Sequence, residues 1–76
     1  MNDLNATQRE STNIVFLRRP DVERITGLSR SSIYAKMKAG EFPRSVQLTS
    51  GIVAWIESEI LAWIKSRIKI RDARTT

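Results

Sequence analysis

Apolar residues recur every three or four positions in three segments of the chain, a spacing that places them on one face of an α-helix. The first segment carries Val22 and Ile25, the second carries Ile33 and Met37, and the third begins near Glu57. Between the second and third segments, apolar and polar residues alternate instead. The pattern therefore predicts three helices and a small β-hairpin, which is a mostly α fold with little β-structure.

Proline, serine and glycine mark where the first two helices begin and end. Pro20 suits the first turn of a helix, and the carboxylates that follow it complement the positive end of the helix dipole. Gly27 favours the left-handed conformation that ends a helix. Ser29 is a good N-cap for the next helix, which Gly40 closes. Two short helices are thus expected on either side of a turn at residues 26–28.

The second half of the chain predicts a hairpin followed by the third helix. Residues 45–55 read as two short strands joined by a turn at residues 49–51. The third helix carries a four-residue repeat of isoleucines at Ile60, Ile64 and Ile68. We expect the large aromatic residues of this region to belong to the core; they are Phe42, Trp55 and Trp63.

The chain is expected to form one domain with an extension at each end. Residues 1–13 contain too few apolar side chains to offset the entropy of ordering them, which predicts a flexible arm. The apolar run at residues 14–17 leads into the core as a short strand. Residues 14–68 form the domain, because a chain of 76 residues is too short to build two cores. Residues 69–76 form a basic tail.

The charge of the chain favours an anionic partner. Thirteen Lys and Arg against eight Asp and Glu give a net charge of +5 and a pI near 10.5, which suits nucleic acid or an anionic membrane. The sequence offers neither the roughly 18 consecutive apolar residues of a transmembrane helix nor the apolar core of a signal peptide. We therefore expect a cytoplasmic protein without a membrane partner.

The residues that most enzymes rely on are missing. The chain has no cysteine and no histidine, which removes thiol nucleophiles, imidazole bases and the best zinc ligands. Glu57 and Glu59 resemble a carboxylate pair, but in the first turn of a helix they complement its dipole. No enzymatic activity, metal, cofactor or small-molecule ligand is expected.

Two short helices, a tight turn between them and a following hairpin match a winged helix-turn-helix. A major groove about 12 Å wide admits one helix, and the outward face of the second helix lacks carboxylates that would repel DNA. Arg30 and Ser31, in its first turn, are best placed to reach base edges. Tyr34 either contacts a base or stays half-buried. The face consists of Arg30, Ser31, Ala35, Lys36 and Lys38.

Four segments of the sequence carry a family resemblance. They are Leu-Arg-Arg-Pro-Asp-Val from Leu17, Thr-Gly-Leu-Ser-Arg-Ser-Ser-Ile-Tyr from Thr26, Lys-Ala-Gly-Glu-Phe-Pro-Arg-Ser-Val-Gln-Leu from Lys38 and Ala-Trp-Ile-Glu-Ser-Glu-Ile-Leu-Ala-Trp-Ile from Ala54. In this order and spacing the chain resembles the AlpA family of small phage- and prophage-associated regulators. These are related to the winged-helix excisionases and, more distantly, to the MerR DNA-binding domain.

The resemblance implies a winged-helix fold that binds double-stranded DNA. It also implies a role either in activating transcription of an integrase gene or in directing excision of an integrated element. Carried onto this sequence, the recognition helix supplies Ser29, Arg30, Ser31, Ser32, Tyr34 and Lys36. The wing spans residues 47–51, with DNA contacts expected from Gln47, Thr49 and Ser50.

The chain departs from the family at two positions that bear on DNA binding. Family members often have a basic residue where this chain has Ala35, and a basic wing tip where it has Thr49 and Ser50. Contacts to phosphates are therefore expected to depend on residues outside these positions. The candidates are Arg18, Arg19, Lys38, Arg44 and the C-terminal tail.

Two expectations concern partners. A single module of this size buries about 600 to 1,000 Å² on DNA and usually binds with modest affinity, so we expect cooperative binding to repeated sites by a dimer or by adjacent monomers. A different class of function remains as an alternative. In it, a protein-interaction module docks through Trp63, Ile64 and Ile68 on an acidic partner, with the basic tail adding electrostatic attraction.

Overall fold

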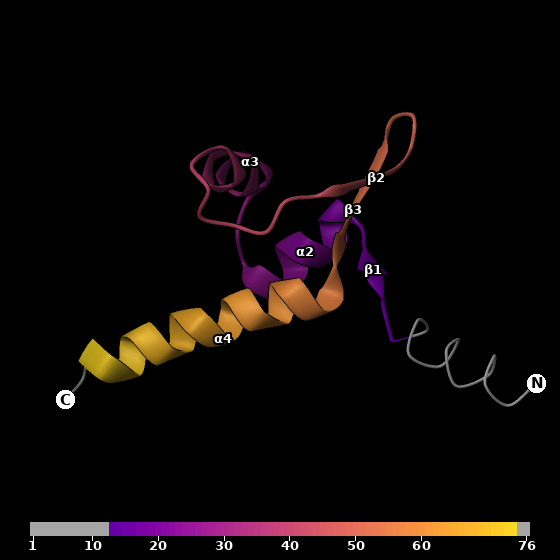
Figure 1. The fold of residues 1–76 in the computed structure, drawn as a ribbon. Helices are drawn as coiled ribbons and strands as arrows, with labels where there is room; N and C mark the ends of the chain where they lie inside the picture. The colour runs from indigo at the N-terminus through magenta and orange to yellow at the C-terminus, as the bar shows by residue number, and fades with distance from the viewer. Residues whose placement is uncertain (1–12, 75–76) are drawn as a thin grey trace, which may run out of the picture.

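The computed structural model describes residues 13–74. The expected flexible arm therefore lies outside the described residues except for Asn13, and so do the last two residues of the expected tail. Figure 1 shows helices packed around a small sheet, with one long helix extending to the C-terminus. The elements are β1 (Phe16–Leu17), α2 (Arg19–Thr26), α3 (Arg30–Lys38), β2 (Val46–Thr49), β3 (Ile52–Ile56) and α4 (Glu57–Arg74). The fold is mostly α with a small antiparallel β-sheet, as the sequence predicted.

Gly27 ends α2 and sets the turn into α3. Its φ of 79° lies in the left-handed region, and its N–H donates to the carbonyl oxygen of Glu23 at 2.8 Å. Pro20 lies in the first turn of α2, but Arg18 is the N-cap, so the helix starts at Arg19 rather than at the proline. Thr26 closes the turn, because its Oγ1 donates to the carbonyl of Val22 and accepts from the N–H of Leu28.

The sheet has the order β1-β3-β2, with both pairs antiparallel. The short strand expected within residues 14–17 forms as β1, and Leu17 lies opposite Trp55 of β3. The expected hairpin forms as β2 and β3. Its register shifts between Gln47 and Thr49, which leaves Leu48 as the extra residue of a β-bulge and strengthens the local twist.

The core is one cluster that draws residues from the helices, the sheet and the loop before β2. Trp55 is completely buried in it, and its indole Nε1 donates to the carbonyl of Pro43 at 3.1 Å. Trp63 packs against the cluster and is half-buried. The aromatic residues expected in the core are therefore part of it or packed on it. The buried members are Leu17, Val22, Ile33, Phe42, Trp55 and Ile60.

α4 begins against the body of the domain and ends away from it. Ile60 is fully buried, whereas Ile68, two turns later, is exposed. The helix continues past residue 68 through Arg74, so the described part of the expected tail is helical. Figure 1 shows its last turns extending beyond the other elements.

Replacing Gly27 with alanine is expected to destabilise the turn between α2 and α3 through backbone strain alone. No heavy atom lies within 4 Å of a Cβ built at this position, so the new methyl group meets no steric clash. The left-handed conformation costs an L-residue about 1 to 2 kcal/mol. Urea unfolding of Gly27→Ala should show that loss, and Ser31→Ala serves as a control. A change below about 0.3 kcal/mol would mean that the turn relaxes without strain.

Candidate nucleic-acid interface

Three serines organise the first turn of α3. Ser29 is the N-cap, and its Oγ accepts from the backbone N–H of Ser32 at 3.2 Å. The same Oγ donates to the Oγ of Ser32 at 3.0 Å and lies 3.3 Å from that of Ser31. The cap satisfies one of the free N–H groups at the helix start. The serines that the sequence assigned to DNA contact thus also hold the start of the helix.

α3 lacks the charges that usually stabilise a helix start. Its first turn contains no acidic residue, whereas α2 has Asp21 and α4 has Glu57 and Glu59 in theirs. Instead Arg30 occupies the first helical position of α3. A cation near the positive end of the helix dipole is unfavourable unless an anion approaches. The helix dipole and Arg30 therefore both contribute positive charge at this end of α3.

Ile33 fixes which side of α3 faces solvent. It is fully buried, and Met37, one turn later, packs against the core. The opposite side is exposed, as the sequence predicted for the outward face. Arg30, Ser31, Tyr34, Ala35 and Lys38 are exposed, and Ser32 and Lys36 are half-buried.

A hollow of about 290 Å³ lies between the start of α2, one side of α3 and the β2–β3 hairpin. It brings together three arginines that are distant in the sequence, and no carboxylate lines it. Of the three, Arg19 is held by an ion pair with Glu23 at 2.7 Å. The lining residues are Arg18, Arg19, Pro20, Arg30, Tyr34, Gly51 and Val53. Positive charge is therefore concentrated where α3 meets the wing.

Tyr34 lies between this hollow and the core. Its ring packs edge-on against Trp55, with ring centroids 6.2 Å apart, and the Arg30 guanidinium lies 5.9 Å from the Tyr34 ring centroid. The side chain of Tyr34 remains 38% exposed. The ring therefore packs partly against the core and partly against Arg30, and its contact with a base stays a prediction.

Lys36 lies on the other side of α3. It lines a separate hollow of about 310 Å³ with Ser32, Ala35 and Glu41. A carboxylate shares that hollow, which makes it less suited to a polyanion. The structure thus separates Lys36 from Arg30, although the sequence placed both on one recognition helix.

The wing residues are exposed at the end of the β2–β3 hairpin. Gln47, Thr49 and Ser50 are all exposed, and the Oγ1 of Thr49 donates to the Ser50 carbonyl at 3.5 Å. The wing reaches the arginine hollow through Gly51, in the hairpin turn, and Val53 of β3. Arg44, before β2, is exposed and lines neither of these two hollows.

The indole N–H groups of two tryptophans donate hydrogen bonds to the segment that connects α3 to the wing. The sequence analysis predicted neither hydrogen bond. Trp63 donates from Nε1 to the carbonyl of Glu41 at 2.9 Å, and Trp55 donates to that of Pro43. Phe42, between the two carbonyls, packs edge-on against Trp63 with centroids 4.9 Å apart. The sequence could have indicated such bonds in general, because the N–H group of a buried tryptophan needs a hydrogen-bond acceptor.

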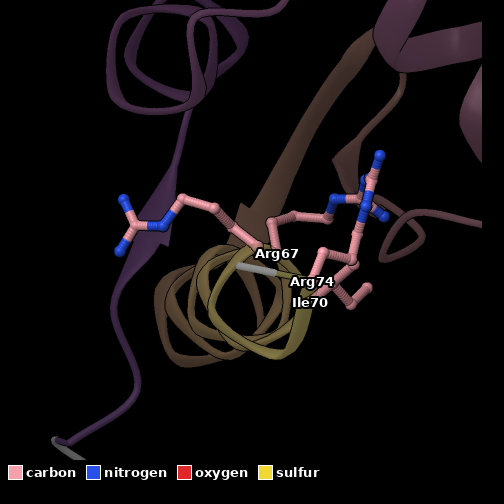
Figure 2. Close-up of a pocket in the computed structure, with 4 residues that line it drawn as sticks. Arg67, Ile70 and Arg74 are labelled. Atoms are coloured by element: carbon pink, nitrogen blue, oxygen red, sulfur yellow. The ribbon is translucent and has the colours of Figure 1, made fainter. Parts of the chain in front are cut away.

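A second basic cluster lies on the last turns of α4. Arg67, Ile70, Arg71 and Arg74 surround a hollow of about 450 Å³, and all of them belong to this helix. Figure 2 labels Arg67, Ile70 and Arg74, and the arginine guanidinium groups in it extend away from the helix. Arg71 pairs with Asp72 at 2.8 Å, and the Arg67 guanidinium lies 6.0 Å from the Trp63 ring centroid. This cluster shares no lining residue with the arginine hollow at α3.

Residues 13–74 show no group of three or more acidic, histidine or cysteine side chains that could hold a metal ion. In that same part of the chain, the helices fall short of the length and apolar character needed to cross a membrane.

Two short helices joined at Gly27, an exposed second helix and an adjacent hairpin define a winged helix-turn-helix protein. Residues 15–68 match the sequence model of the family described as "Prophage CP4-57 regulatory protein (AlpA)", and the chain belongs to this family of phage regulatory proteins. It is also 51% identical over 53 residues to "Uncharacterized protein ORF88" of Enterobacteria phage P4. That match covers 70% of this chain and 60% of the phage protein.

Replacing Ser29 with alanine is expected to cost about 1 kcal/mol of stability, because the N–H of Ser32 loses its capping acceptor. Ser31→Ala, which removes a neighbouring hydroxyl but no cap, should change stability by about 0.5 kcal/mol or less. Urea unfolding of both variants measures the difference. Equal effects of the two changes would show that Ser29 does not act as the cap.

Proposed function

We propose that this protein is a sequence-specific, double-stranded DNA-binding regulator of a phage or an integrated mobile element, and that it acts without catalysis in the bacterial cytoplasm. The observation that carries the proposal is the carboxylate-free arginine hollow beside the exposed face of α3. The net charge of +5 supports it, and so does membership in a phage regulatory family.

In this proposal α3 enters the major groove and its first turn reads bases. Arg30 has a guanidinium that can bind guanine bidentately, and Ser31 lies beside it on the exposed face. The ring of Tyr34 supports the Arg30 side chain through a cation–π contact. The N-cap Ser29 takes part as well, together with Ser32 and Lys36 of α3.

Contacts to phosphates fix the register of the helix in the groove. Arg18 and Arg19 line the hollow next to Arg30, which supports a contact between them and the strand that borders the groove. Lys38, the last residue of α3, and Arg44, before β2, extend the positive surface beyond the first turn of α3. On the other side of the hollow, the wing contacts the flanking backbone or minor groove through Gln47, Thr49 and Ser50.

The regulated process is integration or excision of the element. The protein either controls transcription of the integrase gene or directs excision as an excisionase, since both roles need only the binding and bending of DNA. The family description and the relative from phage P4 support this setting. An excision assay with the integrase of the element, run beside a reporter of the integrase promoter, separates the two roles.

Arg30→Ala is expected to weaken discrimination between a specific site and random DNA by about 1 to 3 kcal/mol. The measurement is a binding titration over a salt series, with DNA fragments from the genomic surroundings of the gene. Arg24→Ala is the matched control, because Arg24 is an exposed arginine that pairs with Asp21 and lies outside the proposed interface. Its binding should remain close to that of the wild type.

A different result would contradict the proposal. Weak binding by the wild type that is equal on all sequences and is lost at modest salt would indicate charge attraction alone. In that case α3 does not read bases, and a protein-interaction role becomes the better explanation.

Cooperative binding to repeated sites is expected, because one module of this size buries about 600 to 1,000 Å² on DNA and binds with modest affinity. Sedimentation of the protein with DNA that carries one or two copies of the site tests it. The second copy should bind more tightly than the first. A tight one-to-one complex on a single short site would contradict this expectation.

A further inference from the structure

The second half of α4 exposes apolar side chains that have no place in the core. Ile68 and Ile70 are 45% and 42% exposed, whereas Ile60, on the first half, is fully buried. Figure 1 shows this part of the helix beyond the other elements. A short helix without tertiary contacts is marginal in water. The projecting half therefore offers a surface on which a partner would add stability.

One apolar stripe runs along α4 at a spacing that suits helix pairing. Leu61, Ile64 and Ile68 follow each other at intervals of three and four residues, which keeps them on one side of the helix. Leu61 is exposed, and Ile64 only packs against the edge of the core. The stripe thus begins on the body of the domain and continues onto the projecting half.

Ile70 belongs to a different side of the helix. It comes two residues after Ile68, and two steps of 100° place it about 160° away around the axis. There it lines the hollow with three arginines (Figure 2). The two isoleucines are similarly exposed but face nearly opposite directions.

The two halves of α4 carry opposite charge. Residues 57–64 contain Glu57 and Glu59 and no basic residue, whereas residues 65–74 contain only one acidic residue, Asp72. Glu57 comes four residues before Leu61 and shares its side of the helix, whereas Glu59 lies on the other side. An antiparallel partner helix of the same sequence would therefore set Glu57 of each copy near Arg71 in the basic half of the other. A parallel partner would set like charges together. The basic residues are Lys65, Arg67, Lys69, Arg71 and Arg74.

We propose that α4 is the surface through which two copies of this chain associate, antiparallel, with Leu61, Ile64 and Ile68 buried between them. The projecting half of each helix then lies along the attached half of the other. Such an interface is two-fold and self-complementary. Because it is small, association is weak and depends on concentration. The inference rests on the proposed function in one respect, since it names the surface behind cooperative DNA binding.

The test compares Ile68→Glu with Ile70→Glu by sedimentation over a concentration series without DNA. Both changes add the same charge at a similarly exposed position, so circular dichroism should show folded protein in each case. The wild type should associate, and Ile68→Glu should raise the dissociation constant by about tenfold or more. Ile70→Glu should behave as the wild type. Equal loss in both variants, or a wild type that stays monomeric both alone and on two-site DNA, would overturn the proposal.

Disulfide trapping tests the orientation, because the chain has no cysteine of its own. Glu57→Cys mixed with Arg71→Cys should give a mixed disulfide under mild oxidation. Disulfides that form instead between two copies of the same variant would indicate parallel helices and overturn the antiparallel arrangement.

Binding to DNA with a single site separates this inference from the proposed function. Ile68→Glu should bind one site as the wild type does and lose only the advantage of a second site. Loss of single-site binding in Ile68→Glu but not in Ile70→Glu would mean that this side of α4 contacts DNA, and would overturn the dimer surface. A wild type that associates but ignores DNA would refute the proposed function and leave the association standing.

Discussion

The burial of Trp55 is the constraint on which the arrangement of α3 and the wing depends. This residue lies in the central strand β3, opposite Leu17 of β1, and is completely buried. Its indole N–H donates a hydrogen bond to the carbonyl of Pro43, in the segment that follows α3, and its ring packs against Tyr34 of α3. One side chain therefore ties the first strand, the candidate recognition helix and the start of the hairpin to the same strand.

This arrangement determines where positive charge gathers. Arg18 and Arg19 follow β1 directly, and β1 is paired to β3, so both arginines lie on the side of α3 that faces Gly51 and Val53 of the hairpin. Arg30 reaches the same place from α3. These arginines line one hollow because the contacts of Trp55 fix β1 and α3 relative to β3.

The helices and strands could be predicted from the sequence because residues at their ends, within a few positions, determine where they start and stop. Gly27 and Ser29 mark their boundaries through a left-handed φ and a capping hydroxyl, and the structure shows both. The start of α2 differs because Arg18, with no side-chain cap, takes the N-cap position ahead of Pro20. The length of α4 was not predicted from the sequence. Its last turns do not pack on the core, so the spacing of apolar residues gives no indication that the helix continues there.

The candidate site was less predictable than the fold, because it depends on contacts between distant segments. The sequence indicated that Arg30 faces outward, and it does. It could not show that Lys36 shares a hollow with Glu41 instead of with Arg30, since that depends on how the loop after α3 is held. The indole of Trp63 holds this loop from α4, a contact between residues 22 positions apart in the chain.

The first turn of α3 shows where function and stability differ in this small domain. The helices on either side start with carboxylates, which stabilise them through the helix dipole. In α3 the same place holds Arg30 and a serine cap, a choice that stability alone does not favour. An incoming phosphate would reverse the sign of this effect, because both the dipole and the guanidinium attract an anion. The domain is thus least favourable electrostatically where an anionic partner would contribute most, which ties part of its stability to binding.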